Sequence, residues 1–223
     1  FQDQLKLLLT ETFKNKKTRD RKGDLPKGFK LIEAHRVEDS FLWGRYAAAR
    51  EKLRLHRGIV EPFCDLDGDG DVDTGGLKTE KALGDFSSHL DASINECYLF
   101  HGTSPEAAHS ITETGFNLEK AGSNVGTMFG AGCYFAEASS KADEYSQRGA
   151  GMYSASFAML VCRVVCGQMF RMTKSDVPAL DCALATGKYD AVLGDREASV
   201  GTYREFVVFD SDLIYPEYLI LYE

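Results

Sequence analysis

The apolar and polar positions in the first quarter of the chain follow a helical period in two places. Near the N-terminus, this spacing predicts an amphipathic helix over residues 2–13. A second helix is predicted to begin with Ser40 as its N-cap and to extend through Leu53. The apolar stripes of the two helices are Leu5, Leu8, Leu9 and Phe13, and Phe41, Leu42, Trp43, Tyr46 and Leu53.

The segment between these helices has a different character. Residues 14–22 form a basic run, for which a solvated turn is the expected structure. Pro26 and Gly28 follow as chain-breaking residues, and residues 29–32 then have the apolar content of a strand entry.

From residue 98 onward, short β-rich runs separated by glycines replace the helical pattern. Two helices are expected to interrupt them, at residues 105–114 and 139–148. Strands this short, with few crossover helices, favour an antiparallel α+β fold over a doubly wound sheet. The predicted strands are residues 98–100, 132–136, 157–165, 205–209 and 218–222.

Composition narrows the class of protein. With 223 residues, 43% of them hydrophobic, the chain can bury one substantial core or two small ones. The formal charge of −8 argues against a domain that holds nucleic acid through its phosphates. No apolar run reaches the roughly 18–20 residues of a membrane-spanning helix. The chain begins at Phe1 with no secretory leader, so we expect a fragment of a longer intracellular protein, nuclear or cytoplasmic.

The six cysteines do not form a metal or disulfide pattern. No Cys-x-x-Cys occurs, and the nearest pair, Cys162 and Cys166, lies in a strand-like run. Free and mostly buried thiols are therefore expected.

Three blocks contain residues suited to chemistry. The first is Leu99-Phe100-His101-Gly102-Thr103, a strand that ends in a polar residue and a glycine. Glycine lets a ligand approach the backbone and use its amide and carbonyl. Alone, this block is weak, because a histidine at a strand end is more often an ordinary half-buried residue.

The second block runs from residue 128 to residue 145 and contains two tyrosines near a predicted helix start. Tyr134 and Tyr145 can hold a flat heteroaromatic ring between them, since offset stacking favours such pairs. The alternative is a strand, turn and helix whose aromatic residues belong to the core.

The third block is an alternating strand, Tyr203 to Phe209, with Glu205 near its start. Burying a glutamate among apolar residues is costly unless it has partners or a catalytic task. The alternative is an edge-strand glutamate that faces water.

Taken together, the three blocks resemble the catalytic domain of the poly(ADP-ribose) polymerase family, and its tankyrase-like branch most of all. The resemblance spans residues 98–222, with a fainter match over residues 32–50. It implies a single ADP-ribosyltransferase domain over residues 1–223, with two packed, mainly antiparallel sheets and flanking helices, and no separate helical regulatory domain. The matching motifs are strand-His-Gly-Thr, Met-Phe-Gly-x-Gly-x-Tyr-Phe-Ala, Ser-Ser-Lys and Glu-Phe-Val-Val followed by Tyr-Pro-Glu-Tyr-Leu-Ile.

The resemblance also implies an activity and its residues. NAD⁺ is the substrate, its nicotinamide–ribose bond is cleaved, and ADP-ribose is transferred, as one unit or a chain, to protein acceptors that include the enzyme itself. The implied catalytic residues are His101, Tyr134 and Glu205. The implied NAD⁺-binding residues are His101, Gly102, Thr103, Tyr134, Ser140 and Tyr145.

The chain departs from the family pattern at one residue and in one segment. Ala142 stands where most relatives carry a serine that bonds the nicotinamide carboxamide, so binding weaker by one hydrogen bond is expected unless Ser139, Ser140 or a water substitutes. Residues 146–157 lack the cysteine and histidine ligands of the tankyrase zinc insertion, so no zinc is expected. Glu205 permits chain elongation without proving it.

An acidic loop over residues 65–76 matches the first nine positions of an EF-hand calcium loop. The twelfth position, which should be a bidentate glutamate, is Gly76. Two structures remain open, a hydrated turn and a weak structural Ca²⁺ site. The candidate ligands are Asp65, Asp67, Asp69, Asp71 and Asp73.

Two other functions remain alternatives. An RNA 2′-phosphotransferase of related type needs basic residues to grip a phosphate, which the acidic composition disfavours. A catalytically silent relative that only binds ADP-ribose usually lacks the histidine or the glutamate, and both are present here.

Overall fold

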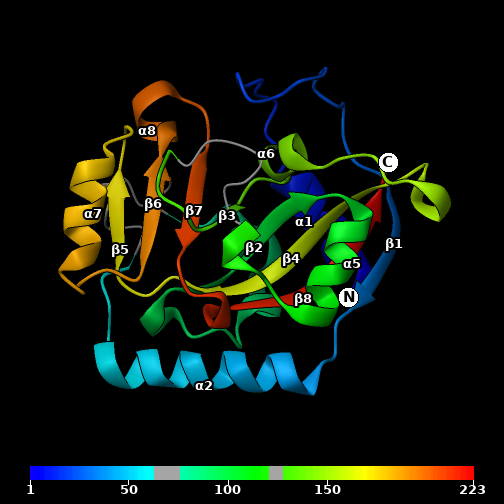
Figure 1. The fold of residues 1–223 in the computed structure, drawn as a ribbon. Coiled ribbons are helices and arrows are strands. Elements are labelled where there is room, and N and C mark those ends of the chain that lie inside the picture. Colours follow the sequence, from blue (N-terminus) through cyan, green and yellow to red (C-terminus); the bar gives the residue numbers. More distant parts are fainter. Residues whose placement is uncertain (63–75, 121–127) are drawn as a thin grey trace.

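The computed structural model describes residues 1–62, 76–120 and 128–223. Its elements are arranged around a central β-sheet (Figure 1). The helices are α1 (Gln2–Glu11), α2 (Ser40–Arg57), α4 (Lys78–Leu83), α5 (Pro105–Thr114), α6 (Ser139–Ala142), α7 (Val177–Ala185) and α8 (Arg196–Val200). The strands are β1 (Leu31–Arg36), β2 (Glu96–Thr103), β3 (Cys133–Ala136), β4 (Phe157–Val165), β5 (Met169–Met172), β6 (Ala191–Asp195), β7 (Arg204–Val208) and β8 (Ile214–Tyr222). Short 3₁₀ turns are η2 (Gly84–Ser87), η3 (Ala92–Ile94), η4 (Leu118–Lys120), η5 (Asp143–Tyr145), η6 (Gly151–Tyr153) and η7 (Ser211–Leu213).

The strands form one mixed sheet, whereas two packed sheets were expected. In the described residues its order is β1-β8-β4-β2-β3-β7-β6-β5, and the neighbours are antiparallel except for the parallel pair β5–β6. The α+β class and the mainly antiparallel pairing were predicted correctly. The predicted number of sheets was wrong, because one residue pair between two strands joins the two expected sheets into one.

That contact is between β2 and β3, which pair through Phe100 and Ala136. By comparison, β2 pairs with β4 along its whole length, from Glu96 to Thr103. The sheet is therefore continuous, but its two halves diverge on either side of the Phe100–Ala136 pair. On β2, His101 directly follows Phe100. On β7, Glu205 is the residue that pairs with Ala136 of β3.

Strand residues alternate between two cores because both faces of the sheet are covered. On β4, Leu160 and Cys162 pack toward one core, and Met159 and Val161 pack toward the other. The first core also takes in buried residues of α2 and α5, while the second takes in Leu5 and neighbouring residues of α1. Figure 1 shows α2 running along one side of the sheet, well away from α6.

The predicted second helix is confirmed, with two corrections. The N-cap is Asp39, whose carboxylate accepts a hydrogen bond from the Leu42 amide at 2.7 Å, and Ser40 is the first helical residue. The apolar stripe is narrower than expected, because the Phe41 side chain is 71% exposed. The residues of the stripe that are buried are Leu42, Tyr46 and Leu53.

The thiols agree with the expectation as far as the structure describes them. Cys97, Cys133, Cys162 and Cys166 are free and buried, and Cys182 is free and exposed. Cys64 lies outside the described residues. None of the described helices combines the length and the apolar character needed to cross a bilayer.

Candidate active site

A cavity of about 960 Å³ opens beside the junction of the two sheet halves. This is at the large end of the roughly 300–1,000 Å³ typical of small-molecule sites. Strands β2, β3 and β7 form its floor, α6 and η5 form one wall, and the N-terminal segment forms another. His101, Tyr134 and Glu205 all line it, so the three predicted catalytic residues come together in one site.

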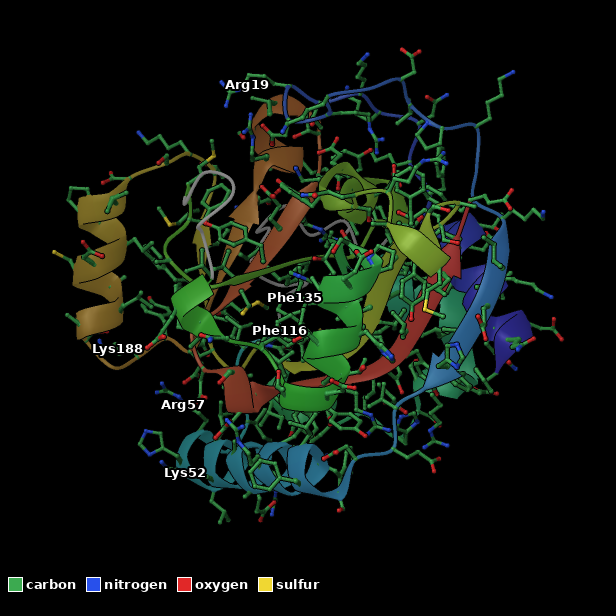
Figure 2. All side chains as sticks on the ribbon, turned by 45° about the vertical axis from the view of Figure 1, so that its right-hand side comes forward. Arg19, Lys52, Arg57, Phe116, Phe135 and Lys188 are labelled. Carbon is green, nitrogen blue, oxygen red and sulfur yellow. The ribbon has the colours of Figure 1, made fainter. Side chains whose placement is uncertain are left out.

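His101 is held in a defined tautomer at the end of β2. Its Nδ1 lies 3.0 Å from the backbone carbonyl of Tyr134, which can only accept, so Nδ1 carries the proton and Nε2 keeps a lone pair. The rings of Phe116 and Phe135 pack against the imidazole at centroid distances of 5.1 and 5.7 Å. Both phenylalanines lie near the centre of the molecule (Figure 2).

Burial lowers the pKa of His101, against the opposing effect of its bond to the Tyr134 carbonyl. The imidazole is therefore neutral at pH 7, because a lowered pKa moves protonation further into the acid range. A neutral ring with a free Nε2 lone pair can accept a hydrogen bond from a hydroxyl group in the cavity.

Tyr134 is fixed by a pair of hydrogen bonds from its own loop. Its hydroxyl donates to the carbonyl of Gly130 at 2.8 Å and accepts from the amide of Phe129 at 3.0 Å. Burial raises the pKa of Tyr134 to about 12, so the phenol stays neutral. The ring face is thereby oriented for stacking, a role that needs no ionisation.

Tyr145, at the end of η5, is held by charged groups. Its hydroxyl accepts from Lys141 Nζ at 3.0 Å and donates to Glu205 Oε1 at 3.4 Å. Burial, with the added charge of Glu205, raises the pKa of Tyr145 to about 12. Tyr134 and Tyr145 line the same cavity, as the predicted ring-binding pair requires.

Glu205 is a buried carboxylate, 7% exposed, on β7, where Arg204 precedes it and the three residues after it are apolar. Lys141 Nζ lies 3.4 Å from its Oε1 and also contacts Glu144 at 2.9 Å and Asp20 at 3.3 Å. Arg21 also pairs with Glu144 and with Asp143, so two cations face four carboxylates and the cluster as a whole is negative. Such surroundings stabilise positive charge that develops nearby.

Lys141 belonged to the Ser-Ser-Lys motif but was not predicted as a site residue. Burial alone would lower the pKa of its ammonium, but the negative groups around it, Glu205 foremost, raise the pKa above its ordinary value. It is 3% exposed and its Nζ lies 4.8 Å from the centroid of the Tyr145 ring. The sequence feature that could have predicted it is a lysine among the small residues Ala138, Ser139, Ser140 and Ala142 at the start of a helix.

Gly102 is required by a close crossing of two chain segments. A Cβ at this position would lie 1.8 Å from the carbonyl oxygen of Ala142, which is backbone and cannot rotate away. The glycine therefore allows α6 to lie directly against β2, which brings Lys141 and Tyr145 to the cavity. Thr103, the next predicted binding residue, also lines the cavity.

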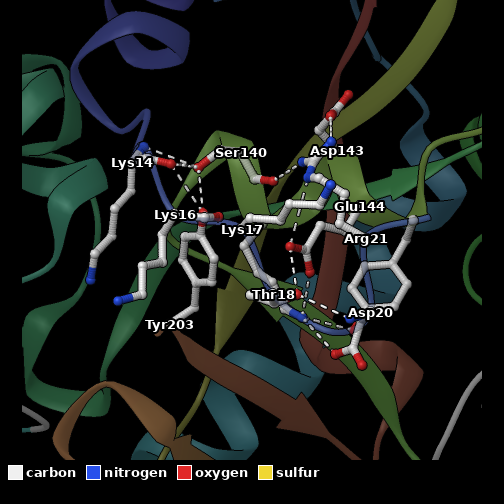
Figure 3. Close-up of polar contacts among 12 residues, drawn as sticks. Lys14, Lys16, Lys17, Thr18, Asp20, Arg21, Ser140, Asp143, Glu144 and Tyr203 are labelled. Atoms are coloured by element: carbon white, nitrogen blue, oxygen red, sulfur yellow. Dashed lines mark hydrogen bonds and ion pairs between the residues drawn. The ribbon is translucent and has the colours of Figure 1, made fainter. Parts of the chain in front are cut away.

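Ser140 is not among the residues that line the cavity, and its assignment to NAD⁺ binding stays a prediction. Its hydroxyl bonds the backbone of Lys14, donating to the carbonyl at 2.9 Å and accepting from the amide at 3.0 Å, and it contacts the hydroxyl of Tyr203 at 3.1 Å (Figure 3). Ser139 likewise donates to the carbonyl of Leu9 at 2.7 Å. Neither serine replaces the hydroxyl that is missing at Ala142, because both hydroxyls hold the N-terminal segment.

The basic run at residues 14–22 is only partly the solvated turn expected from its composition, because Lys14 and Arg21 are anchored to the protein while its other basic residues are exposed. Arg21 is 6% exposed at its side chain and forms an ion pair with Asp143 at 2.7 Å. The Tyr203 hydroxyl donates to the carbonyls of Lys14 and Lys16 (Figure 3). The acidic partners of this segment, Asp143, Glu144 and Glu197, lie more than a hundred residues away in sequence. The composition of the segment itself therefore could not predict these contacts.

The calcium expectation falls on Asp65, Asp67, Asp69, Asp71 and Asp73, which lie outside the described residues. It therefore remains a prediction. In the described part of the chain, no group of three or more His, Cys, Asp or Glu side chains is arranged to hold a metal ion.

A model of the poly(ADP-ribose) polymerase catalytic domain matches residues 11–201. This range contains His101 and Tyr134 and ends shortly before Glu205. The assignment of Glu205 therefore rests on its motif and its position in the cavity.

Among curated relatives, the protein mono-ADP-ribosyltransferase PARP12 of Mus musculus is 32% identical over 130 residues, which cover 58% of this chain and 17% of the relative. The Homo sapiens PARP12 is 30% identical over 131 residues, with the same two shares. The protein mono-ADP-ribosyltransferase PARP10 of Mus musculus is 35% identical over 127 residues, 56% of this chain and 12% of the relative. The aligned segment thus spans less than a fifth of each of these relatives.

Proposed function

Because the chain belongs to the poly(ADP-ribose) polymerase catalytic domain family, we propose that it is an NAD⁺ ADP-ribosyltransferase that modifies proteins. In this reaction the bond between ribose C1′ and the nicotinamide nitrogen breaks, and nicotinamide leaves with the bonding electrons. A nucleophile of the acceptor protein then forms a new bond to C1′. NAD⁺ is the substrate, and protein acceptors, including the enzyme itself, are the proposed partners.

The proposed binding mode places nicotinamide between the rings of Tyr134 and Tyr145. Both phenols are neutral and fixed by hydrogen bonds, so the two ring faces are ordered before the substrate arrives. Gly102 and Thr103 also line the cavity, and the backbone of Gly102 and the side chain of Thr103 supply polar contacts for the carboxamide. Ser140 has no part in this mode, because its hydroxyl is bound to the N-terminal segment.

His101 has the role of orienting the sugar. Its Nε2 lone pair accepts a hydrogen bond from an NAD⁺ ribose hydroxyl, while Nδ1 remains bound to the carbonyl of Tyr134. A protonated imidazole would lose this acceptor, so the low pKa of His101 matches the role.

Glu205 has the role of stabilising charge. Its carboxylate binds the 2′-hydroxyl of the nicotinamide ribose, and its negative charge stabilises the cationic sugar as the glycosidic bond breaks. The interaction strengthens only as positive charge develops, which is what lowers a barrier. The observation that supports the proposal most strongly is that this buried carboxylate shares one cavity with His101 and the two tyrosines.

We propose that a single ADP-ribose unit is added at each acceptor site. The supporting observation is that the PARP12 and PARP10 relatives are named as mono-ADP-ribosyltransferases. These relatives are not tankyrases, so they give no support to the tankyrase-like branch favoured by the motifs. Intact-mass measurement after reaction with NAD⁺ separates single additions from a ladder of chain lengths.

Labelled NAD⁺ provides the test of the activity itself. The purified chain is incubated with NAD⁺ labelled in its adenylate half, and nicotinamide release and protein-bound label are measured together. We expect both signals. A silent relative that only binds ADP-ribose would give neither, and an RNA 2′-phosphotransferase would consume NAD⁺ only when 2′-phosphorylated RNA is added.

The wider assignments remain proposals. We propose an intracellular, nuclear or cytoplasmic, protein whose domain does not itself bind nucleic acid, on the basis of the formal charge of −8. A structural Ca²⁺ at residues 65–76, and the absence of zinc, are predictions of the same standing.

A further inference from the structure

The N-terminal segment contributes a carboxylate to the cavity that the proposed mechanism does not use. Asp20 lines the cavity, and its side chain is 28% exposed. Its Oδ2 lies 3.3 Å from Lys141 Nζ, and that nitrogen lies 3.4 Å from Glu205 Oε1. The carboxylate oxygens of Asp20 and Glu205 can therefore be no further apart than the sum of these two distances.

Anchors on both sides of Asp20 fix its backbone. On one side, the Thr18 hydroxyl donates to Glu144 at 2.7 Å and accepts from the Asp20 amide at 3.2 Å. On the other, the Arg21 guanidinium donates to Asp143 at 2.7 Å and to the carbonyl of Ser140 at 2.6 Å (Figure 3). The neighbours Thr18 and Arg21 therefore bind α6 and η5 and fix the position of Asp20 at the cavity.

We propose that Asp20 is an acceptor of ADP-ribose within the same chain. This inference rests on the proposed function. A carboxylate oxygen of Asp20 attacks C1′ of the nicotinamide ribose and forms an ester bond. The C1′–N bond breaks, and its electron pair neutralises the cationic nicotinamide ring as it leaves. The carboxylate gives up its negative charge in the new bond, so the step needs no base and no further reactant.

Position favours Asp20 over the other carboxylates of the cluster. Glu144 is fully buried and is held by Thr18, Arg21 and Lys141. Asp143 accepts hydrogen bonds from Arg21 at 2.7 Å and from the Tyr222 hydroxyl at 2.6 Å. Asp20 combines partial exposure with a fixed position close to Glu205, and a nucleophile held near the reacting carbon gains a large advantage over one that must diffuse.

The experiment begins with the unaltered chain. It is incubated with labelled NAD⁺, and the modified residue is located by peptide mass spectrometry. We expect the label at Asp20, and we expect neutral hydroxylamine to release it, because hydroxylamine cleaves carboxylate esters. We also expect the fraction of chains labelled per minute to be independent of protein concentration, because the acceptor belongs to the same molecule.

Two matched variants extend the test. Asp20→Asn keeps the side-chain shape and removes the nucleophile, and we expect at least a tenfold slower incorporation of label. Asp3→Asn removes an exposed carboxylate of α1 that pairs with Lys6 at 3.3 Å and does not line the cavity, and we expect incorporation close to that of the unaltered chain.

The outcomes separate this inference from the function on which it rests. Three results overturn the inference but leave the function intact, provided that nicotinamide is released. The label is found only at residues other than Asp20, the labelled fraction per minute rises with protein concentration, or Asp20→Asn incorporates label as fast as the original chain. Nicotinamide release without any protein-bound label also overturns it. Absence of nicotinamide release would count against the proposed function itself.

Discussion

Replacing Glu205 by glutamine is the sharpest test of the proposed chemistry. The amide keeps the size of the side chain and one hydrogen-bonding oxygen but removes the negative charge beside the breaking bond. Loss of one preorganised electrostatic group typically lowers kcat about 10²–10³-fold, or roughly 2.7–4 kcal/mol. We expect nicotinamide release by Glu205→Gln to fall by this factor, with a smaller change in NAD⁺ affinity, because the charge acts mainly in the transition state.

The fold should survive this substitution. Lys141 retains Glu144 at 2.9 Å and Asp20 at 3.3 Å, so its buried ammonium is not left without a counter-charge when Glu205 becomes neutral. The usual cost of breaking a buried ion pair, about 3–5 kcal/mol, arises from an uncompensated charge and should be largely avoided here. We expect the thermal midpoint to change by only a few degrees.

A second buried glutamate supplies the control. Glu137 directly follows β3 and is not among the residues that line the cavity; it is 1% exposed and pairs with Arg204 at 2.7 Å and Lys78 at 3.2 Å. Glu137→Gln should lower the thermal midpoint but leave nicotinamide release per folded molecule nearly unchanged. If Glu205→Gln retained near-full release, or if both variants lost release to the same extent, the catalytic assignment of Glu205 would be wrong.

Three further predictions follow from the site and the acidic loop. Ala142→Ser should tighten binding of a benzamide-type nicotinamide mimic by up to about tenfold, because one neutral hydrogen bond contributes about 0.5–1.5 kcal/mol; calorimetry on both proteins decides this, and unchanged affinity would mean that the carboxamide is already satisfied. Gly102→Ala should abolish most nicotinamide release and lower the free energy of unfolding by about 1–3 kcal/mol or more, because its Cβ would lie 1.8 Å from the Ala142 carbonyl oxygen; normal activity in that variant would contradict the close crossing. If the loop at residues 65–76 binds calcium, millimolar Ca²⁺ should raise the thermal midpoint and chelator should reverse the shift; equal midpoints would leave the hydrated turn.

The parts of the fold that the sequence predicted well are those with a strong local signal. Helix α5 has the predicted bounds because Ser104 caps it and Pro105 occupies its first turn, and β4 has the predicted bounds because nine consecutive apolar or half-buried residues leave no other structure. The helix expected over residues 139–148 ends at Ala142 and continues only as the turn η5. Its last residue, Ala142, lies against Gly102 of β2, a tertiary contact that the local pattern does not contain.

The missed elements have weak local patterns and distant partners. Strands β5 and β6 have four and five residues, and they pair in parallel with each other across α7, so their stability depends on a crossover that no local period reveals. The meeting of His101, Tyr134 and Glu205 in one cavity could be predicted because three motifs resembled one family. The role of Ser140 in holding Lys14, and the approach of Asp20 to Lys141, could not be predicted, because each depends on a contact between segments more than a hundred residues apart.

The division of the sheet explains why the site forms where it does. Antiparallel neighbours normally pair along several residues, which would leave no space between β2 and β3. Here the pairing is confined to Phe100 and Ala136, and the polar residues His101 and Glu205 follow directly beside this pair. Diverging strands expose backbone and side chains that a continuous ladder would cover, and α6 closes the opening only because Gly102 lets it approach. The cavity and the exposure of His101 and Glu205 to it are therefore consequences of the same local break in strand pairing.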